Sequence, residues 1–341
     1  MDHPRRAHSF VPQAVLASVT LLASLPVWPD LAPSTECGSS RRDATDQVQA
    51  TCFEMQHAGR IRTARIYVGG NVKGAAPLIF VLHGGSGAGS GMELMTRARF
   101  NRIADREGAI VAYPDGVDRH WNDGRDIPET AVRENVDDVG FVLALIEALA
   151  SRHPLDRGRV FATGISNGGF MSMRLACDAA TTFAAVAPVT ASLSEKLGAR
   201  CQPLQAVAVA IINGTDDPIV PWSGGAIRLF GVARGEIWSA ERTFGRWLDL
   251  DACRERAAAA RIDRNAEDDT ALVIHKGSAC RDGVHVWLYE IQGGGHTWPM
   301  GVPYANERLV GRTSQELDAT EEIWKFMTAN ARSSAKRESD E

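Results

Sequence analysis

The segment "GISNGG", residues 164–169, decides how the chain around it folds. It follows an apolar run at 160–162 and precedes a run with helical spacing of apolar residues that starts at Phe170. Ser166 is the only serine with a glycine two positions before it and another two positions after it. A strand that turns sharply into a helix presents such a serine at the tip of the turn. The pattern predicts a nucleophile; a serine in an ordinary glycine-rich turn is the alternative.

Apolar runs alternate with helical patterns along the rest of the chain. The expected strands are 64–68, 76–85, 109–116, 159–166, 207–215 and 284–295, and the expected helices are 92–107, 136–149, 168–179, 236–250 and 314–331. Strands that are apolar throughout are buried on both faces, as in a parallel sheet. The alternation therefore predicts a single α/β domain with helices on both faces of the sheet. Thr313 and Glu316 are expected to form a capping box at the last helix.

The bulk composition is that of a globular protein. The 341 residues are 44% hydrophobic and 23% charged, with a net charge of -5. A weakly acidic chain gives no reason to expect a nucleic acid or an anionic membrane as partner, so we expect neutral or weakly charged substrates. The sequence has neither C-x-x-C nor H-E-x-x-H. We therefore expect no metal and no cofactor.

The N-terminus resembles a secretory signal. Arg5 and Arg6 precede the short uncharged stretch 14–25, "AVLASVTLLASL". A basic start before a short apolar core is typical of a signal peptide, and an uncleaved membrane anchor is the alternative. We expect a secreted protein, extracellular or periplasmic. The expected parts are a signal peptide at 1–30, a linker at 31–49, a catalytic domain at 50–331 and a disordered tail at 332–341.

Six cysteines agree with export, because an oxidising compartment lets them pair. Six cysteines allow fifteen connectivities, and pairing of sequence neighbours is the simplest. These neighbours are Cys37 with Cys52, Cys177 with Cys201, and Cys253 with Cys280.

A serine hydroxyl needs a base, and the loops after two later strands supply an acid and a histidine. His296, in "GGGHTWP" at 293–299, is the only histidine after Ser166 in such a loop. His275 and His285 lie in or near expected strands and are interpreted as surface or packed residues. The carboxyl ends of parallel strands meet at one edge of the sheet, where open α/β sheets bind their ligands.

Asp216 and Asp217 compete for the role of the acid. Both lie in "INGTDDPIVP", residues 212–221. Pro218 favours an extended conformation at Asp217, and this favours Asp217 as the partner of the histidine. Asp216 then becomes a turn residue that bonds to its own backbone.

The oxyanion of an acyl-transfer reaction needs two backbone N–H donors. Asn167, directly after Ser166, is one candidate. Gly85, in "LHGGSG" at 82–87, is the other, because this segment follows an early apolar strand. A flexible turn is the alternative for that segment.

Two tryptophans and two aspartates are further candidates near the site. Trp298 and Trp121 are expected to contact the acyl or alcohol part of an ester, with hydrophobic packing as the alternative. Asp137 and Asp138 are expected to cap the helix that follows them.

Seven blocks occur in order: "LHGGSG", "YPDG", "WND", "VDDVGFV", "GISNGGFM", "GTDDPIVPW" and "GGGHTWP". Over about residues 50–330 the chain resembles the secreted polyhydroxybutyrate depolymerase and feruloyl or acetyl-xylan esterase-like family of α/β hydrolases. The resemblance implies the α/β-hydrolase fold and a triad of Ser166, Asp217 and His296, since the family's acid motif is G-T-x-D-P. It also implies the disulfides Cys177–Cys201 and Cys253–Cys280.

The chain departs from this family at two places. Some relatives carry cysteine where Gly85 stands. This difference affects the segment 82–87, which we call the oxyanion loop. Many relatives have a glycine-rich segment where this chain has "WPMGVPYANERLVG". The loop at 299–312 is therefore expected to reshape the pocket beside His296.

These observations predict a secreted serine carboxylic-ester hydrolase that works through an acyl-enzyme. The expected substrates are polymeric or oligomeric 3-hydroxybutyrate esters, or feruloyl and acetyl esters. An α/β-hydrolase peptidase and a catalytically silent binding module of the same fold are the alternatives. The sequence shows no separate polymer-binding domain, so soluble or oligomeric esters are favoured.

Overall fold

The computed structural model describes Met1 and residues 50–229, 231–257 and 261–332. The described residues from 50 to 332 belong to one compact unit, which contains every helix and strand described below. The predicted signal peptide and linker lie outside the described residues apart from Met1, as does the predicted tail apart from Arg332.

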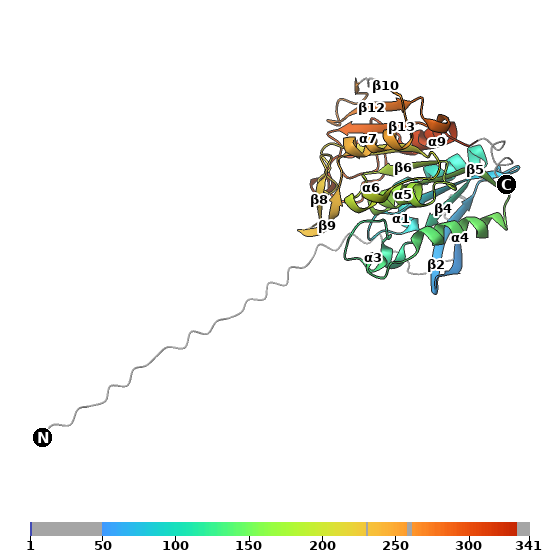
Figure 1. Ribbon diagram of the computed structural model, residues 1–341, viewed down its shortest axis with the longest axis horizontal. Helices are drawn as coiled ribbons and strands as arrows, with labels where there is room; N and C mark the ends of the chain where they lie inside the picture. The colour runs from blue at the N-terminus through green and yellow to red at the C-terminus, as the bar shows by residue number, and fades with distance from the viewer. Residues whose placement is uncertain (2–49, 230, 258–260, 333–341) are drawn as a thin grey trace. The chain divides into compact units, whose positions relative to one another are not determined.

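Eleven strands of the described residues form one large sheet (Figure 1). They are β1 (Thr51–His57), β2 (Arg60–Val68), β3 (Ala76–Leu82), β4 (Ile110–Pro114), β5 (Leu155–Ile165), β6 (Ala185–Val189), β7 (Ala208–Gly214), β10 (Glu255–Ala257), β11 (Arg261–Ile262), β12 (Ala271–Ser278) and β13 (Val286–Gln292). Their order is β1-β2-β4-β3-β5-β6-β7-β13-β12-β10, and β11 pairs with β12. The six strands from β4 to β13 in this order are parallel, and antiparallel strands extend both edges.

Helices cover both faces of the sheet. They are α1 (Gly89–Met95), α2 (Arg99–Glu107), α3 (Thr130–Arg133), α4 (Asp138–Ala150), α5 (Asn167–Asp178), α6 (Glu195–Arg200), α7 (Ala240–Leu250), α8 (Glu307–Val310) and α9 (Ala319–Ala329). Helices α4 and α5 lie in front of the sheet in Figure 1. A separate hairpin of β8 (Gly225–Leu229) and β9 (Val232–Ile237) follows β7 in the chain.

The sheet carries a hydrophobic core on each of its faces, and alternate residues of the same strands contribute to the two cores. In β3, Leu78 and Phe80 join the core that contains apolar residues of α4, α5 and α7. Ile79 and Val81 join the core formed with α2 and α9. Every residue of β3 is buried, as in β4 and β7. Alternate side chains point to opposite faces, so a strand covered on both sides is apolar throughout. The predicted α/β sheet is confirmed.

Two expectations about helices are wrong. The single helix expected at 92–107 is two helices, because Arg97 and Ala98 adopt left-handed backbone angles with φ of 55° and 50°. The helix expected from 314 begins only at Ala319, where the Asp318 side chain accepts from the backbone N–H of Glu321.

The predicted capping box of Thr313 and Glu316 is also wrong. The buried Glu316 carboxylate instead accepts from the backbone N–H groups of Arg264 and Asn265, at 2.6 and 2.7 Å. The Glu316 side chain therefore fixes the loop at Arg264 and Asn265 and does not cap a helix.

Of the two aspartates at the start of α4, only Asp137 caps the helix. Its carboxylate accepts from the backbone N–H of Gly140 at 2.9 Å, as predicted. Asp138 is fully buried and pairs with Arg62 at 2.6 Å, and it accepts from the backbone N–H of Asn122 at 2.7 Å. It holds the loop containing Asn122 against β2.

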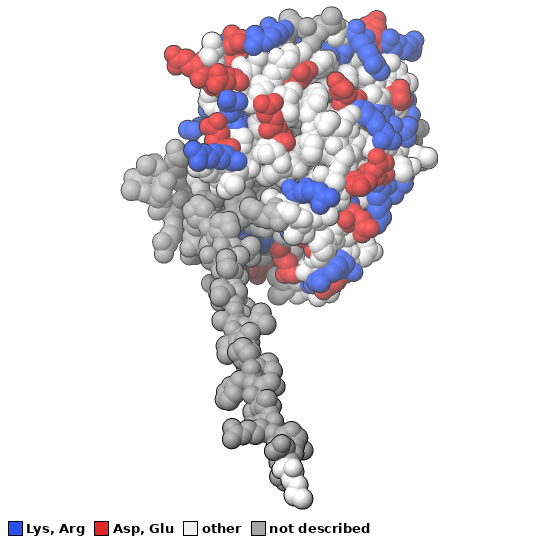
Figure 2. All heavy atoms as spheres, turned by 90° about the vertical axis from the view of Figure 1, so that its left-hand side faces the viewer, with Lys and Arg blue, Asp and Glu red and all other residues white. Residues whose placement is uncertain are grey.

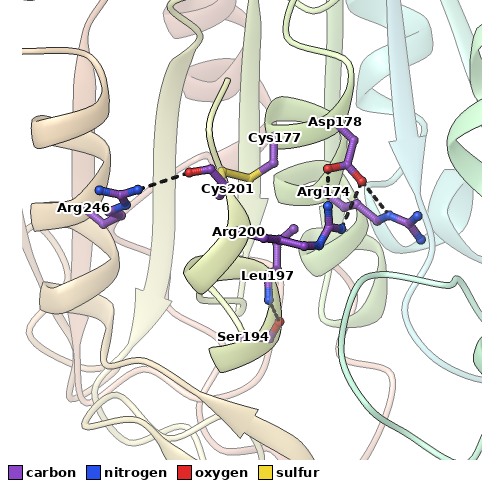
Figure 3. Close-up of a disulfide and its surroundings, with 8 residues drawn as sticks. All are labelled: Arg174, Cys177, Asp178, Ser194, Leu197, Arg200, Cys201 and Arg246. Atoms are coloured by element: carbon purple, nitrogen blue, oxygen red, sulfur yellow. Dashed lines mark hydrogen bonds and ion pairs between the residues drawn. A yellow bond between two sulfur atoms is a disulfide. The ribbon is translucent and has the colours of Figure 1, made fainter. Parts of the chain in front are cut away.

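Two of the predicted disulfides are present, Cys177–Cys201 and Cys253–Cys280. The predicted pair of Cys37 with Cys52 includes a residue outside the described ranges. Figure 3 shows that Cys177–Cys201 joins the end of α5 to the end of α6. Beside it, the Asp178 carboxylate accepts from Arg174 at 3.0 Å and from Arg200 at 2.8 Å.

The described part of the chain ends on an anchored residue. The Arg332 guanidinium donates to the carbonyl oxygens of Ala180, Phe183 and Ala206, at 2.6, 2.8 and 3.1 Å. Arg332, the first residue of the segment predicted to be a disordered tail, is therefore packed against the domain.

The described surface mixes both signs of charge. On the face shown in Figure 2, acidic and basic side chains alternate without a continuous area of one sign. Among the described residues, no helix has the length and apolar content to cross a membrane.

Candidate active site

The nucleophile candidate stands on a tight turn between β5 and α5. Ser166 has φ 54° and ψ -121°, a backbone conformation that is rare for any residue except glycine. A β-carbon at Gly168 would lie 2.3 Å from the carbonyl oxygen of Leu82, so only glycine fits there. Strained backbone of this kind is found at functional sites, where the surrounding packing maintains it. The geometry is that of a strand-to-helix nucleophile turn.

The acid and histidine candidates contact each other. His296 Nδ1 lies 2.7 Å from Asp217 Oδ2, and both side chains are almost fully buried. The other carboxylate oxygen, Oδ1, accepts from the backbone N–H groups of Ile219 and Val220, both at 2.8 Å. The carboxylate is thus held in one orientation. An Nδ1–H that donates to Asp217 leaves Nε2 as the atom that can accept a proton.

Asp216, the competing acid, is placed differently. Its side chain is exposed, and its backbone N–H donates to the carbonyl of Gly294 at 3.0 Å. Thr215 donates a hydroxyl hydrogen bond to the Asp216 carboxylate at 2.9 Å. The Asp216 side chain thus bonds to a neighbouring hydroxyl and not to its own backbone, and it makes no contact with His296 in the described part of the chain.

The sheet topology brings the three candidates to one edge. Ser166 follows β5, Asp217 follows β7 and His296 follows β13, and these strands run parallel with β6 between β5 and β7. Their carboxyl ends therefore share one edge of the sheet, the usual place for ligands in open α/β sheets.

The segment 299–312 fixes the backbone of Gly295 and His296, which we call the histidine loop. Val310 accepts from the backbone N–H of His296 at 2.5 Å, and Arg312 accepts from that of Gly295 at 2.9 Å. The Tyr304 hydroxyl donates to the carbonyl oxygen of His296 at 2.9 Å. Burial, and then the charge of Asp217, raise the pKa of Tyr304, so its hydroxyl keeps the proton that it donates. Tyr304 was not predicted, although its segment stood out as a departure from relatives.

The two predicted oxyanion donors lie next to each other. A β-carbon built on Gly85 would lie 3.9 Å from the Asn167 β-carbon, and one built on Gly84 would lie 3.6 Å from the Ser166 β-carbon. Among the described residues, none accepts a hydrogen bond from the backbone N–H of Gly85 or of Asn167. Two unused N–H groups beside a serine at a helix N-terminus form a suitable site for a developing oxyanion.

His83 fixes the backbone of the oxyanion loop. Its Nδ1 lies 2.7 Å from the carbonyl oxygen of Gly84, and its Nε2 accepts from the backbone N–H of Gly116 at 2.9 Å. Burial lowers the pKa of His83 to about 4. The neutral ring thus has its donor on Nδ1 and its acceptor on Nε2, which matches both partners.

Both predicted substrate-contacting tryptophans are buried and bonded to protein. Trp121 is 0% exposed and its indole N–H donates to the carbonyl oxygen of His83 at 3.0 Å. Trp298 is 2% exposed and its indole N–H donates to the hydroxyl of Thr320 at 3.1 Å. These positions support the alternative of hydrophobic packing for both residues.

The Asn167 side chain joins the nucleophile turn to the loop at 121–125. Its Oδ1 accepts from the backbone N–H of Trp121 at 2.8 Å, and its Nδ2 donates to the Trp121 carbonyl at 3.1 Å. Nδ2 also donates to Asp123 at 2.6 Å, and Asp123 pairs with Arg125 at 2.6 Å. The candidate donor Asn167 is therefore held by its own side chain, a role that the local sequence did not reveal.

His275 and His285 make contacts with residues outside the candidate triad. His275 pairs with Glu290 at 2.7 Å, and His285 bonds to Asn330 at 2.9 Å. In residues 50–229, 231–257 and 261–332, no three His, Cys, Asp or Glu side chains are arranged to hold a metal ion.

Comparison with known proteins identifies the family to which the chain belongs. The family model "Esterase PHB depolymerase" matches residues 63–219, which include both Ser166 and Asp217. The chain is 30% identical over 338 residues to "Putative esterase NocK" of Nocardia uniformis subsp. tsuyamanensis, covering 92% of this chain and 96% of that protein. The chain belongs to this esterase family. It is an enzyme that hydrolyses carboxylic esters.

The esterase is also similar to proteins whose names specify the kind of ester. It is 29% identical over 228 residues to "Feruloyl esterase B" of Piromyces equi, and this match covers 65% of the esterase but 40% of that protein. Two solved structures support the α/β-hydrolase fold. A thermostable esterase has a TM-score of 0.52 at 15% identity, covering 83% of this chain and 64% of its own. An acetyl xylan esterase from Aspergillus awamori has a TM-score of 0.51 at 14% identity, covering 73% of this chain and 95% of its own.

Proposed function

We propose that the esterase works by two-step acyl transfer with Ser166 as nucleophile, His296 as base and Asp217 as its partner. The observation that carries this proposal is the buried 2.7 Å contact between His296 Nδ1 and Asp217 Oδ2, at the sheet edge where Ser166 also lies. Asp217 fixes the imidazole tautomer and stabilises the imidazolium that forms during the reaction.

In the first step, His296 Nε2 takes the proton of the Ser166 hydroxyl as the oxygen attacks the ester carbonyl. The carbonyl oxygen becomes an oxyanion, which the backbone N–H groups of Asn167 and Gly85 stabilise. The tetrahedral intermediate collapses when the imidazolium gives its proton to the leaving alcohol, and Ser166 then carries the acyl group. In the second step, water gives a proton to His296 as its oxygen attacks the acyl carbonyl of the acyl-enzyme. The imidazolium then returns this proton to the Ser166 oxygen as the bond between that oxygen and the acyl carbon breaks, and the acid leaves.

We propose two substrate classes for this chemistry. One is 3-hydroxybutyrate-type esters, which the matching family's description supports. The other is feruloyl or acetyl esters, which the names of a relative and a solved structure support. The mixed charges on the face shown in Figure 2 fit a neutral substrate better than a polyanion.

We also propose that the protein is secreted, with residues 50–331 as its catalytic domain. The two disulfides support an oxidising compartment. The basic start followed by a short apolar stretch at 14–25 supports export.

The test is the initial rate of the purified protein on methyl ferulate and on a 3-hydroxybutyrate oligomer. Each rate is compared with that of the Ser166→Ala variant under the same conditions. An excess on one substrate that the variant lacks supports both the triad and that substrate class. Equal rates for the two proteins on a hydrolysed ester contradict the assignment of Ser166.

A further inference from the structure

His120 lies directly against the oxyanion loop. A β-carbon built on Gly85 would lie 3.1 Å from His120 Nε2 and 3.3 Å from its Cδ2. That β-carbon on Gly85 would also lie 3.9 Å from the β-carbon of Asn167. The imidazole therefore borders the place where the two proposed oxyanion donors meet, and Asn167 directly follows Ser166 in the chain.

The chain holds this ring in one orientation. His120 Nδ1 lies 2.9 Å from the carbonyl oxygen of Asp118. A carbonyl can only accept, so Nδ1 carries the hydrogen of the neutral ring and Nε2 carries a lone pair. Among the described residues, none makes a hydrogen bond to Nε2. The ring thus presents an unused acceptor on the side of Gly85.

The turn that carries His120 is tied to the oxyanion loop. Asp118 and Arg119 have left-handed backbone angles, with φ of 47° and 62°. The Arg119 carbonyl accepts from the backbone N–H of Ser86 at 2.9 Å. Consecutive non-glycine residues in this conformation persist only where the surroundings maintain them. The position of His120 is therefore fixed relative to the loop that contains Gly85.

The surroundings also keep the ring neutral. Burial lowers the pKa of His120, and the positive charges of Arg234 and Arg125 lower it further, against the Asp118 carbonyl and the Asp123 charge. A neutral ring of this tautomer accepts at Nε2 and cannot donate there.

We propose that His120 is a specificity-determining residue whose Nε2 accepts a hydrogen bond from a hydroxyl group of an ester bound at Ser166. This inference rests on the proposed function. Gly85 and Asn167 supply donors, which suit the oxyanion, whereas a lone pair beside them repels an oxyanion. The complement of that lone pair is an O–H on the part of the substrate next to the ester group. Esters with such a hydroxyl are preferred to those that carry a methyl group in its place.

The test uses two pairs of esters that differ by hydroxyl against methyl. Ethyl 3-hydroxybutyrate and ethyl 3-methylbutyrate place the difference on the acyl side, and 2-hydroxyethyl butyrate and propyl butyrate place it on the alcohol side. For each pair, the ratio of kcat/KM, hydroxyl over methyl, is measured for the wild type, His120→Phe and His120→Gln. His120→Phe keeps a ring without the acceptor, and His120→Gln keeps an acceptor oxygen.

We expect the ratio of one pair to fall about fivefold or more in His120→Phe, the effect of one lost hydrogen bond, and to be largely retained in His120→Gln. The pair that changes identifies the side of the ester that carries the hydroxyl. Ratios that are the same in the wild type and in His120→Phe for both pairs overturn the proposal, whether or not the overall rates fall. Ser166→Ala is measured on the same esters, since activity that survives it contradicts the proposed function and not this inference alone.

Discussion

The hydroxyl of Tyr304 donates to the carbonyl oxygen of His296 at 2.9 Å, so a residue eight positions after the proposed base fixes the backbone of that base. Tyr304 belongs to the segment 299–312, which also accepts from the backbone N–H groups of Gly295 and His296. The segment that separates this chain from many relatives therefore supports the position of the base, in addition to any effect on the pocket.

Replacing Tyr304 by phenylalanine tests this support. We expect kcat to fall about fivefold with a smaller change in KM, because the lost hydrogen bond loosens His296 without removing a substrate contact. Tyr289→Phe is the matched control, since it removes a hydroxyl that donates to Glu322 at 3.1 Å, away from the histidine loop. Equal kcat values for Tyr304→Phe and Tyr289→Phe would show that the Tyr304 contact does not position the base.

The choice between the two neighbouring aspartates gives a second prediction. We expect Asp217→Asn to lower kcat by about 10³- to 10⁴-fold, because the amide no longer fixes the imidazole tautomer or stabilises the imidazolium. Asp216→Asn, at an exposed position, is expected to stay within about twofold of the wild type. Steady-state rates on one ester compare the two variants, and a similar loss in both would contradict the assignment of Asp217.

The strands that position the site were predictable because they are buried on both faces. Such strands are apolar throughout, as in β3 and β7. Strand β6 was missed, because "AVAPV" is short and contains Pro188. The β8–β9 hairpin was missed because its strands are largely exposed and carry no regular alternation of apolar residues.

The predictable part of the site was the part encoded by short motifs at strand ends. Ser166, Asp217 and His296 each stand in such a motif, and the structure brings the acid and the histidine into contact. Tyr304 and His120 have no local pattern that marks them, because their roles depend on loops that meet only in the folded chain. The two tryptophans were expected to contact the substrate because they lie near the site motifs in the sequence. Their place in the sequence could not reveal that both indoles are buried and bonded to protein groups.

The buried His83 gives a prediction about acid stability. Burial lowers the pKa of His83 to about 4 in the folded protein, whereas a histidine in the unfolded chain has a pKa of about 6.5. Between these values the unfolded chain binds a proton that the folded protein does not bind. The contribution of His83 to the free energy of unfolding is therefore lost as the pH falls from about 6.5 to about 4.

We expect His83→Gln to be less stable than the wild type at pH 7, because glutamine does not reproduce both contacts of the ring. The difference between the two proteins should narrow at pH 4.5. Urea unfolding at both values measures this, with His153→Gln as a control at a half-buried histidine outside the site. A difference that is independent of pH would mean that His83 is not the group that titrates.

Asp251, at the end of α7, gives the opposite pH dependence. It is fully buried, one of its carboxylate oxygens has no hydrogen-bond partner among the described residues, and burial raises its pKa from 3.8 to about 7. Between pH 3.8 and about 7 the folded protein keeps a proton that the unfolded chain has released. The free energy of unfolding therefore decreases as the pH rises through this window, and the loss is complete above it.

We expect Asp251→Asn to stabilise the protein at pH 8, where the wild type carries a buried charge, by about 1 kcal/mol or more. At pH 5 the wild-type carboxyl is protonated, so the gain should be small or absent. Thermal unfolding at both values provides the measurement, and Asp249→Asn, at an exposed position two residues earlier, is the control. A gain of equal size at pH 5 and pH 8, or one shared by Asp249→Asn, would show that the stabilisation does not come from removing a charge at Asp251.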